Sequence, residues 1–182
     1  MSHVLVPLAQ GCEELEAITI TDLLVRAGID VTTCGLDDQP VKASRGITII
    51  PDTSIDKVMD QTFDLIVLPG GLPGADHLRD NTAVQTLIKQ QAEKDGYLAA
   101  ICAAPKALAQ AGVLDGRTAT AYPGTLPALN NDRISISDRA VEIDGNVITS
   151  RGPGTAMDFA LTLIEQLSGL EKRNEVEAQL VR

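Results

Sequence analysis

Residues 99–105 read Ala-Ala-Ile-Cys-Ala-Ala-Pro, and this stretch decides the fold of the chain. An apolar run leads into Cys102, and Pro105 stands where the first turn of a helix is expected. A nucleophile elbow needs small residues two places to either side of the nucleophile, because the strand and helix backbones nearly touch there. Ala100 and Ala104 occupy those two places. The spacing therefore predicts Cys102 at a sharp strand-to-helix turn.

Two interpretations of Cys102 remain open at this point. The beginning of a helix stabilises a thiolate, so the first interpretation is a reactive thiol with a lowered pKa. The second is a buried core cysteine, which is the commonest environment of a free thiol.

Outward from this turn, short apolar runs alternate with longer helical segments, which predicts an α/β fold with a mostly parallel sheet. Continuous apolar runs such as residues 65–68 indicate strands covered on both faces. Strands are expected at Val4–Leu8, Asp30–Cys34, Leu65–Leu68, Tyr97–Cys102, Thr118–Tyr122 and Asn146–Thr149. Helices are expected at Glu14–Ala27, Thr82–Lys94, Pro105–Ala111, Thr155–Leu167 and Leu170–Leu180. Hairpins are expected at 41–50 and at 134–147, the second around Asp144-Gly145.

The composition narrows the class of protein. The 182 residues suit one domain spanning 1–182, and an aromatic share of 2% requires an aliphatic core. A formal net charge of −10 disfavours nucleic-acid and anionic-membrane surfaces. We expect neither a signal peptide nor a membrane span in this sequence. Three cysteines without a CxxC pair indicate neither a zinc site nor a disulfide framework, so we expect no metal, no cofactor and a cytoplasmic location.

Glu16 is the second candidate for chemistry. It shares one helical stripe with Ile20, Leu23, Leu24 and Ala27. An ionised carboxyl is costly to bury, so Glu16 is expected to have a raised pKa and to be protonated. Its neighbours Glu13 and Glu14 are expected to be solvated residues of a first helical turn.

Two glycine-rich loops complete the candidate site. Residues 68–74, Leu-Pro-Gly-Gly-Leu-Pro-Gly, lack the nucleotide-binding fingerprints and favour a tight turn whose backbone N–H approaches a reacting atom. Residues 150–155, Ser-Arg-Gly-Pro-Gly-Thr, form either a wall of the same cleft or a simple capped turn. The two histidines, His3 and His77, are placed at a strand start and in a surface turn, so neither is an obvious base for Cys102.

Four motifs together resemble the ThiJ/PfpI superfamily, in the YajL-like branch that groups with the Parkinsonism-associated deglycase proteins. The resemblance covers essentially the whole chain. Its most specific pieces are Gly-Cys-Glu-Glu-Leu-Glu-Ala at 11–17, Val-Leu-Pro-Gly-Gly at 67–71, Ala-Ala-Ile-Cys-Ala-Ala-Pro at 99–105 and Thr-Ser-Arg-Gly-Pro-Gly-Thr at 149–155.

The resemblance implies a flavodoxin-like, doubly wound sandwich that pairs as a homodimer, with the first long helix and the hairpin near Arg45 close to the interface. It implies that Cys102 is the nucleophile and that protonated Glu16 is hydrogen-bonded to it. Gly71 and Ala103 would supply backbone N–H groups, and Arg26 with Arg45 would attract anions to the mouth of the site.

The chain departs from the family pattern at two positions. Protease-like members follow the nucleophile with His, whereas Ala103 stands here, so peptidase activity is disfavoured. Many closer relatives place a His before a downstream Pro, whereas Tyr122 precedes Pro123 here. Tyr122 either lines the pocket or packs at a strand end, and no third catalytic partner is transferred.

Two functions fit these residues. The resemblance implies a cysteine-dependent deglycase of proteins or nucleotides, or a glyoxalase-type enzyme, that acts on methylglyoxal and glyoxal adducts and protects against carbonyl and oxidative stress. The alternative is a redox-sensing, oxidation-activated chaperone in which Glu16 stabilises a Cys102 sulfinate. Both use the same two residues, so the motifs alone do not separate them.

Overall fold

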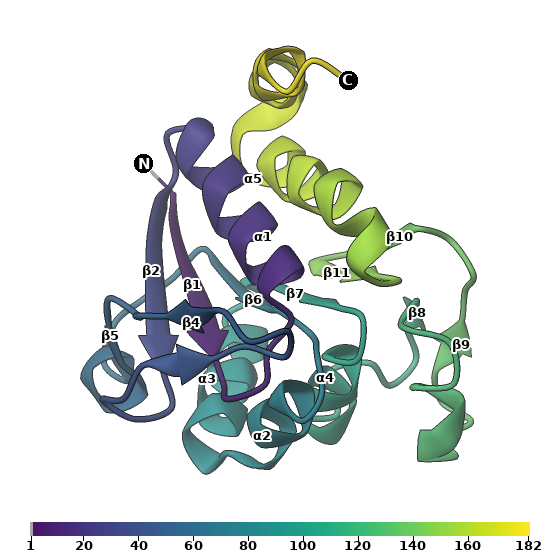
Figure 1. Ribbon diagram of the computed structural model, residues 1–182. Coiled ribbons are helices and arrows are strands. Elements are labelled where there is room, and N and C mark those ends of the chain that lie inside the picture. Colours follow the sequence, from purple (N-terminus) through teal and green to yellow (C-terminus); the bar gives the residue numbers. More distant parts are fainter. Residues whose placement is uncertain (1) are drawn as a thin grey trace.

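A seven-stranded sheet forms the centre of the molecule (Figure 1). The computed structural model describes residues 2–182. The strands lie in the order β10-β11-β7-β6-β1-β2-β5, and β10–β11 is the antiparallel pair at one edge. Their bounds are β1 His3–Leu8, β2 Asp30–Gly35, β5 Thr53–Ser54, β6 Leu65–Leu68, β7 Tyr97–Ile101, β10 Val141–Asp144 and β11 Val147–Ser150. The predicted flavodoxin-like, mostly parallel α/β fold is confirmed.

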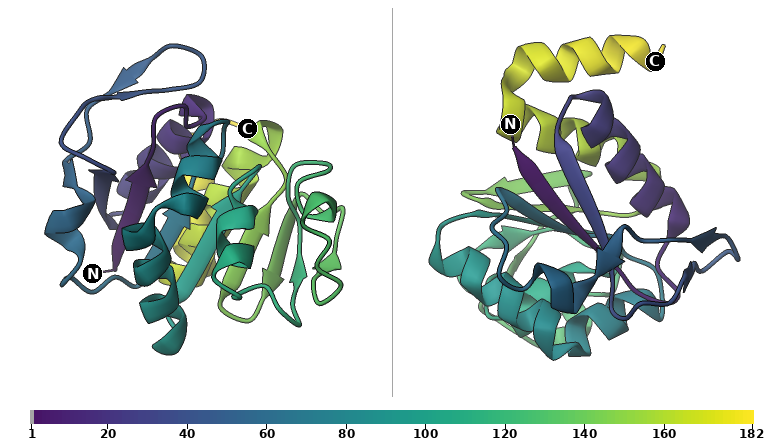
Figure 2. Two further views of the ribbon diagram at one scale, coloured as in Figure 1. Left: turned by 90° about the horizontal axis from the view of Figure 1, so that it is seen from below. Right: turned by 90° about the vertical axis from the view of Figure 1, so that its left-hand side faces the viewer.

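Helices cover both faces of this sheet, as Figures 1 and 2 show. On one face lie α1 (Glu14–Arg26) and α5 (Ala156–Gln179), which pack on each other. On the other lie α2 (Gly74–Asp80), α3 (Thr82–Glu93) and α4 (Pro105–Gln110). All four residues of β6 are buried, as a doubly covered strand requires. No helix within residues 2–182 combines the length and apolar character needed to cross a bilayer.

The core is aliphatic, as the composition predicts. Phe159 of α5 is the largest fully buried side chain, and leucines and isoleucines fill most of the rest. The central strands contribute Leu5, Ile66 and Leu98, each at most 2% exposed. This packing fixes the carboxyl ends of β1, β6 and β7, where open α/β sheets hold their ligands.

The first predicted hairpin is confirmed, whereas the second is only partly right. Strands β3 (Val41–Lys42) and β4 (Thr48–Ile49) pair antiparallel around Gly46. The turn at Asp144-Gly145 exists, but it joins β10 to β11 at the edge of the main sheet. The earlier residues form β9 (Ser135–Ile136), which pairs in parallel with β8 (Thr118–Ala119). The strand expected at Thr118–Tyr122 therefore ends early and lies outside the main sheet, where β10 rather than β8 occupies the edge beside β11.

The sequence predicts helix α5 almost correctly but misses helix α2. Helix α2 was expected to be a turn, because its beginning is rich in glycine and proline; it also carries His77. The two helices expected on either side of residue 169 are continuous in α5 except at Gly169, whose backbone is non-helical with φ +85°. Beyond Gly169 the helix lies at the end of the sheet opposite the arrowheads (Figure 1). Short 3-10 helices complete the fold: η1 Ile55–Val58, η2 Pro127–Leu129 and η3 Pro153–Thr155.

Candidate active site at Cys102

Cys102 lies between β7 and α4 with a left-handed backbone, at φ +63°. Hydrogen bonds on both sides hold this conformation. The Cys102 N–H donates to the Ser150 carbonyl at 2.9 Å, and its own carbonyl accepts the Tyr122 N–H at 2.8 Å. Ala100 and Ala104 are fully buried, so the close approach of strand and helix leaves no room for larger side chains there. The structure thus forms the strand-to-helix turn that the sequence predicts.

Backbone N–H groups of Gly71 and Ala103 lower the pKa of the Cys102 thiol and so favour its thiolate. Gly71 has φ +89°, and a Cβ atom there would lie 2.3 Å from the backbone nitrogen of Glu13. Only glycine therefore allows the loop after β6 to approach the sulfur in this way. The structure brings both residues to the place that the family resemblance implies.

The Glu16 carboxyl lies beneath the thiol and is 0% exposed. Its Oε2 accepts the Gly70 N–H at 2.7 Å, while Oε1 has no hydrogen-bond partner of its own among the described residues. A Cβ atom at Gly70 would lie 2.6 Å from Cys102 Cβ and 2.8 Å from Glu16 Oε2, so a glycine here lets the three groups meet. Burial raises the pKa of Glu16 to about 7, against smaller lowering effects of the Gly70 N–H and the Cys102 thiol.

The expectation of a lowered Cys102 pKa is wrong for this arrangement. Burial and the nearby Glu16 carboxyl raise the pKa of the thiol to about 12, and the N–H groups of Gly71 and Ala103 lower it by less. The thiol and the carboxyl therefore titrate as a coupled pair, in which transfer of the thiol proton to the Glu16 carboxylate would generate the thiolate.

The thiol faces a cavity of about 380 Å³. Cys102 itself is 8% exposed, and Arg45 lies on the cavity wall, as expected. Tyr122 lines the cavity and is 54% exposed, and Pro153 places the loop 150–155 on the same wall. The lining residues are Glu13, Ser44, Arg45, Gly71, Leu72, Cys102, Ala103, Lys106, Tyr122, Thr125 and Pro153.

Arg26 is not brought to this cavity. It ends α1, about 15 Å along the helix axis from Glu16 at 1.5 Å per residue. Its Nε pairs with Asp22 Oδ2 at 2.7 Å. The cation that lines the cavity together with Arg45 is instead Lys106, which the motifs did not single out. One signal for it exists in the sequence: a cation in the first turn of a helix is unfavourable, so Lys106 there invites a functional explanation.

Glu13 and Glu14 are buried rather than solvated, because the hairpin turn at residues 44–46 covers them. The Ser44 hydroxyl donates to both carboxyls at 3.1 Å, and the Arg45 N–H donates to Glu14 at 2.9 and 3.0 Å. Burial raises the pKa of Glu14, but these backbone and hydroxyl donors hold it below its usual value. Glu14 thereby fixes the loop that carries Arg45.

The other thiols and the histidines lie apart from the cavity. Cys12 and Cys34 are fully buried, and burial raises their pKa values to about 11 and about 12. His3 lies within hydrogen-bonding distance of the Thr32 hydroxyl, at 2.9 Å, and His77 lies on α2. Among residues 2–182 there is no group of three or more His, Cys, Asp or Glu side chains arranged to hold a metal ion.

Comparison with known proteins identifies the family. The model of the DJ-1/PfpI family matches residues 2–166. The chain belongs to the DJ-1/PfpI family. Protein dj-1beta of Drosophila melanogaster is 48% identical over 178 residues, which cover 97% of this chain and 95% of that protein. The family expected from the four motifs is therefore confirmed.

Other DJ-1/PfpI proteins resemble this one in fold and sequence. The crystal structure of Drosophila DJ-1beta superposes with a TM-score of 0.95 at 47% identity, covering 100% of this chain and 98% of that one. The structure named "Toxoplasma gondii DJ-1, oxidized" has a TM-score of 0.94 at 38% identity, with the same coverage. Glutathione-independent glyoxalase DJR-1.2 of Caenorhabditis elegans is 38% identical over 167 residues, covering 92% of this chain and 89% of that protein.

The raised pKa of Glu16 predicts a pH-dependent loss of stability. Between pH 4.5 and about 7 the native carboxyl stays protonated while the unfolded one ionises, so stability falls as pH rises through this window. Glu16→Gln removes the ionisation. The free energy of unfolding of the Glu16→Gln variant minus that of wild type should therefore rise by up to about 3 kcal/mol from pH 5 to pH 8.

Urea unfolding followed by circular dichroism at both pH values measures this difference. Glu171→Gln, at an exposed position of α5, is the matched control and should show no such trend. A constant difference between Glu16→Gln and wild type across the window would contradict the raised pKa.

Proposed function

We propose that this protein is a cofactor-independent, cysteine-dependent enzyme of α-oxoaldehyde chemistry, a glyoxalase-type enzyme or deglycase that acts on methylglyoxal and glyoxal or their adducts. One observation carries the proposal: the Cys102 sulfur meets two backbone N–H groups and a carboxyl of pKa about 7 at a cavity of about 380 Å³. Membership of the DJ-1/PfpI family and similarity to a protein named a glutathione-independent glyoxalase support it.

In the proposed reaction, Cys102 attacks the aldehyde carbon of methylglyoxal as its proton passes to the Glu16 carboxylate. The new S–C bond gives a hemithioacetal whose oxyanion is stabilised by the N–H groups of Gly71 and Ala103 and then takes the proton back from Glu16. Glu16 next moves a proton from the former aldehyde carbon to the neighbouring carbon through an enediol. The resulting thioester is hydrolysed by water, which releases lactate and restores the thiol.

Glu16 suits these transfers because a group with a pKa near the working pH is effective both as a base and as an acid. For a glycated protein or nucleotide, the same thiol would attack the carbonyl-derived carbon of the adduct. The amine would then leave with the proton that Glu16 holds. Protection against carbonyl stress would follow from either reaction.

The test is lactate production from methylglyoxal by the reduced protein. Cys102→Ser should abolish it, and Glu16→Gln should lower kcat at least about 100-fold, the usual contribution of general acid–base catalysis. In wild type, kcat/KM should rise with pH through about 7 and then level off, since the reactive pair holds one proton rather than two. Lactate formation that survives in Cys102→Ser would overturn the proposal.

A second function, oxidation sensing, is favoured by a separate observation. Of the three thiols, only Cys102 has exposed surface, and the donors around it would also bind sulfinate oxygens. The similar Toxoplasma protein is named as oxidized. One peroxide would convert the thiolate to sulfenate with loss of water, and a second would give the sulfinate, to which protonated Glu16 would donate.

Peptide mass spectrometry after mild peroxide treatment tests this second function. We expect sulfinate at Cys102 in wild type, a lower yield in Glu16→Gln, and unmodified Cys12 and Cys34. An unchanged yield in Glu16→Gln would remove Glu16 from this role.

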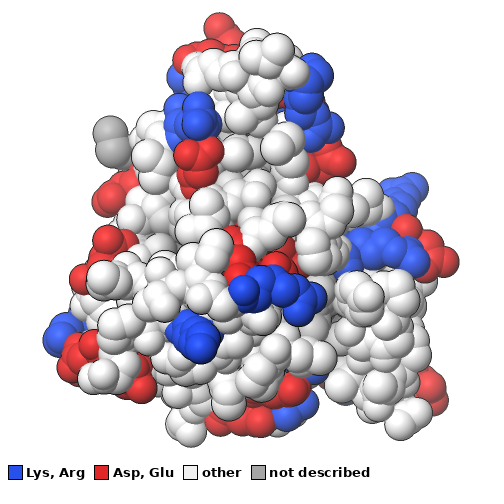
Figure 3. All heavy atoms as spheres, in the orientation of Figure 1, with Lys and Arg blue, Asp and Glu red and all other residues white. Residues whose placement is uncertain are grey.

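We also propose that the protein is a homodimer that pairs through α1. Leu15, Ile18 and Val25 on this helix are each about half exposed, and Ile47 and Ile50 of the neighbouring hairpin are exposed as well. The middle of α1 lies in a largely uncharged area of the face shown in Figure 3. Apolar side chains gathered in this way are typical of a subunit contact.

Sedimentation velocity should give twice the chain mass of 19.2 kDa for wild type. Ile18→Glu should shift the protein toward the monomer, because it places a charge in the apolar contact. Ile136→Glu is the matched control, since Ile136 is equally exposed but lies on β9. A monomeric wild type would contradict the proposed pairing.

A further inference from the structure

Lys106 is the least expected group at the Cys102 cavity. It is the second residue of α4, four positions after the thiol, and it lines the same cavity. Its side chain is only 14% exposed, so most of the aliphatic stem is packed against the protein. The ammonium is thereby held at one wall of the site rather than free in solvent.

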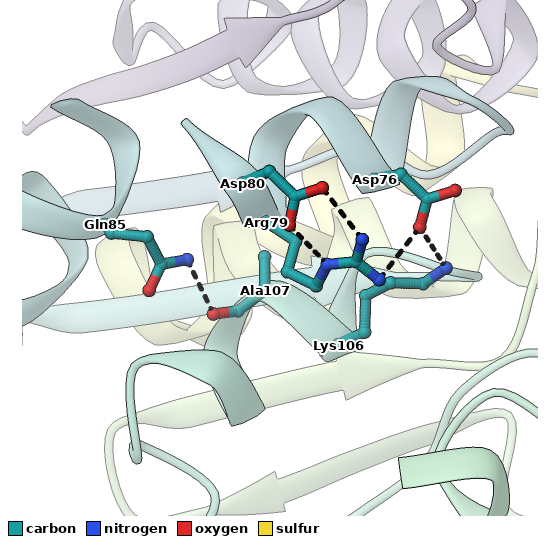
Figure 4. Close-up of polar contacts among 6 residues, drawn as sticks. All are labelled: Asp76, Arg79, Asp80, Gln85, Lys106 and Ala107. Atoms are coloured by element: carbon teal, nitrogen blue, oxygen red, sulfur yellow. Dashed lines mark hydrogen bonds and ion pairs between the residues drawn. The ribbon is translucent and has the colours of Figure 1, made fainter. Parts of the chain in front are cut away.

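A network of ion pairs on α2 holds the Lys106 ammonium in place (Figure 4). Lys106 Nζ donates to Asp76 Oδ1 at 2.8 Å. The same carboxyl oxygen lies 3.2 Å from an Arg79 nitrogen, and Arg79 makes two further hydrogen bonds to Asp80. The Asp76 carboxylate is therefore shared between Lys106 and Arg79, so it offsets only part of the charge on Lys106. An ammonium has three N–H donors, and Asp76 accepts one of them.

A second cation, Arg45, reaches the cavity from a separate segment. Its backbone N–H is fixed by the buried Glu14 carboxylate, so the loop that carries it is tethered. The lining side chains include one acid, Glu13, and two cations, Arg45 and Lys106. In a chain with a formal net charge of −10, cations thus outnumber acids among the residues that line this cavity.

We propose that Lys106 binds an anionic group of the substrate, so that the Cys102 site prefers α-oxoaldehydes or adducts that carry a carboxylate or phosphate. This inference rests on the proposed function, whose substrate class it narrows. Lys106 acts by attracting and orienting the anion, with Arg45 assisting from the loop. Asp76 is a positioning residue that keeps the ammonium at the cavity wall.

Alkylation of Cys102 by two reagents of nearly equal size tests the charge preference without any turnover. Iodoacetate is anionic and iodoacetamide is neutral, and each forms a sulfur–carbon bond at Cys102 with loss of iodide. A change in thiol pKa alters both rates alike, so the ratio of the two rates reports the interaction with the reagent's charge. The Cys102 peptide is quantified by mass spectrometry.

Lys106→Met should lower the iodoacetate-to-iodoacetamide rate ratio at least about threefold, because one charge at close range is removed. Asp76 keeps Arg79 as its partner in this variant, so its own charge remains paired. Lys106→Arg should retain the ratio. Lys89→Met, which removes a charge from an exposed position of α3, is the matched control and should also retain it. An unchanged ratio in Lys106→Met would overturn the proposal.

Turnover then separates this proposal from the proposed function. Methylglyoxal is neutral, whereas 4,5-dioxopentanoate has the same dicarbonyl group and an added carboxylate, and its expected product is 2-hydroxyglutarate. Lys106→Met should lower kcat/KM for 4,5-dioxopentanoate at least about threefold more than for methylglyoxal. If wild type converts neither compound, the proposed function fails, and the alkylation ratio still decides whether Lys106 attracts anions. An equal loss on both substrates would overturn the role of Lys106 in substrate choice.

Discussion

The hydrogen bond from the Gly70 N–H to the buried Glu16 carboxyl is the contact on which the site depends. It joins α1 to the loop after β6 at 2.7 Å, directly beneath the thiol of the elbow. Three backbone segments converge there, so a side chain at residue 70 would collide with both chemical groups. Burial of the carboxyl at this junction brings its pKa close to neutrality, although the Gly70 N–H itself lowers the pKa. The buried Glu16 carboxyl therefore both links two segments of the fold and supplies the titratable group beside the thiol.

Reactivity at this junction belongs to a pair of groups rather than to Cys102 alone. Burial and the carboxylate both raise the pKa of the thiol, so in the proposed reaction Glu16 takes the proton as the sulfur attacks. This differs from a thiol activated by a helix terminus or by a histidine, and no histidine lies on the wall of the cavity. The same coupling would serve both the proposed carbonyl chemistry and the proposed oxidation.

Much of this could be predicted from local sequence. The spacing of small residues around Cys102 defined the elbow, the apolar stripe defined a buried Glu16, and alternating apolar runs defined the sheet. The predictions that failed concern residues whose environment is set by contacts between distant segments. Glu13 and Glu14 are buried because a hairpin about 30 residues later covers them. Helix α2 forms where glycines suggested a turn, and its first residue, Gly74, packs closely on the distant Gly11 and Cys12. Arg26 was assigned to the site from the family resemblance alone, although helix geometry carries it away from the cavity.

The groups of Gly71 and Ala103 that favour the Cys102 thiolate are main-chain amides, which has a consequence for how such a protein can diversify. Substitutions that keep the backbone path leave those amides in place, so the reactive apparatus is insulated from most changes in its surroundings. The outer wall of the cavity is instead formed by side chains such as Lys106 and Tyr122, which can change without altering those amides. One scaffold can therefore be retuned toward new ligands by single replacements at the rim, while the chemistry at its centre is inherited unchanged.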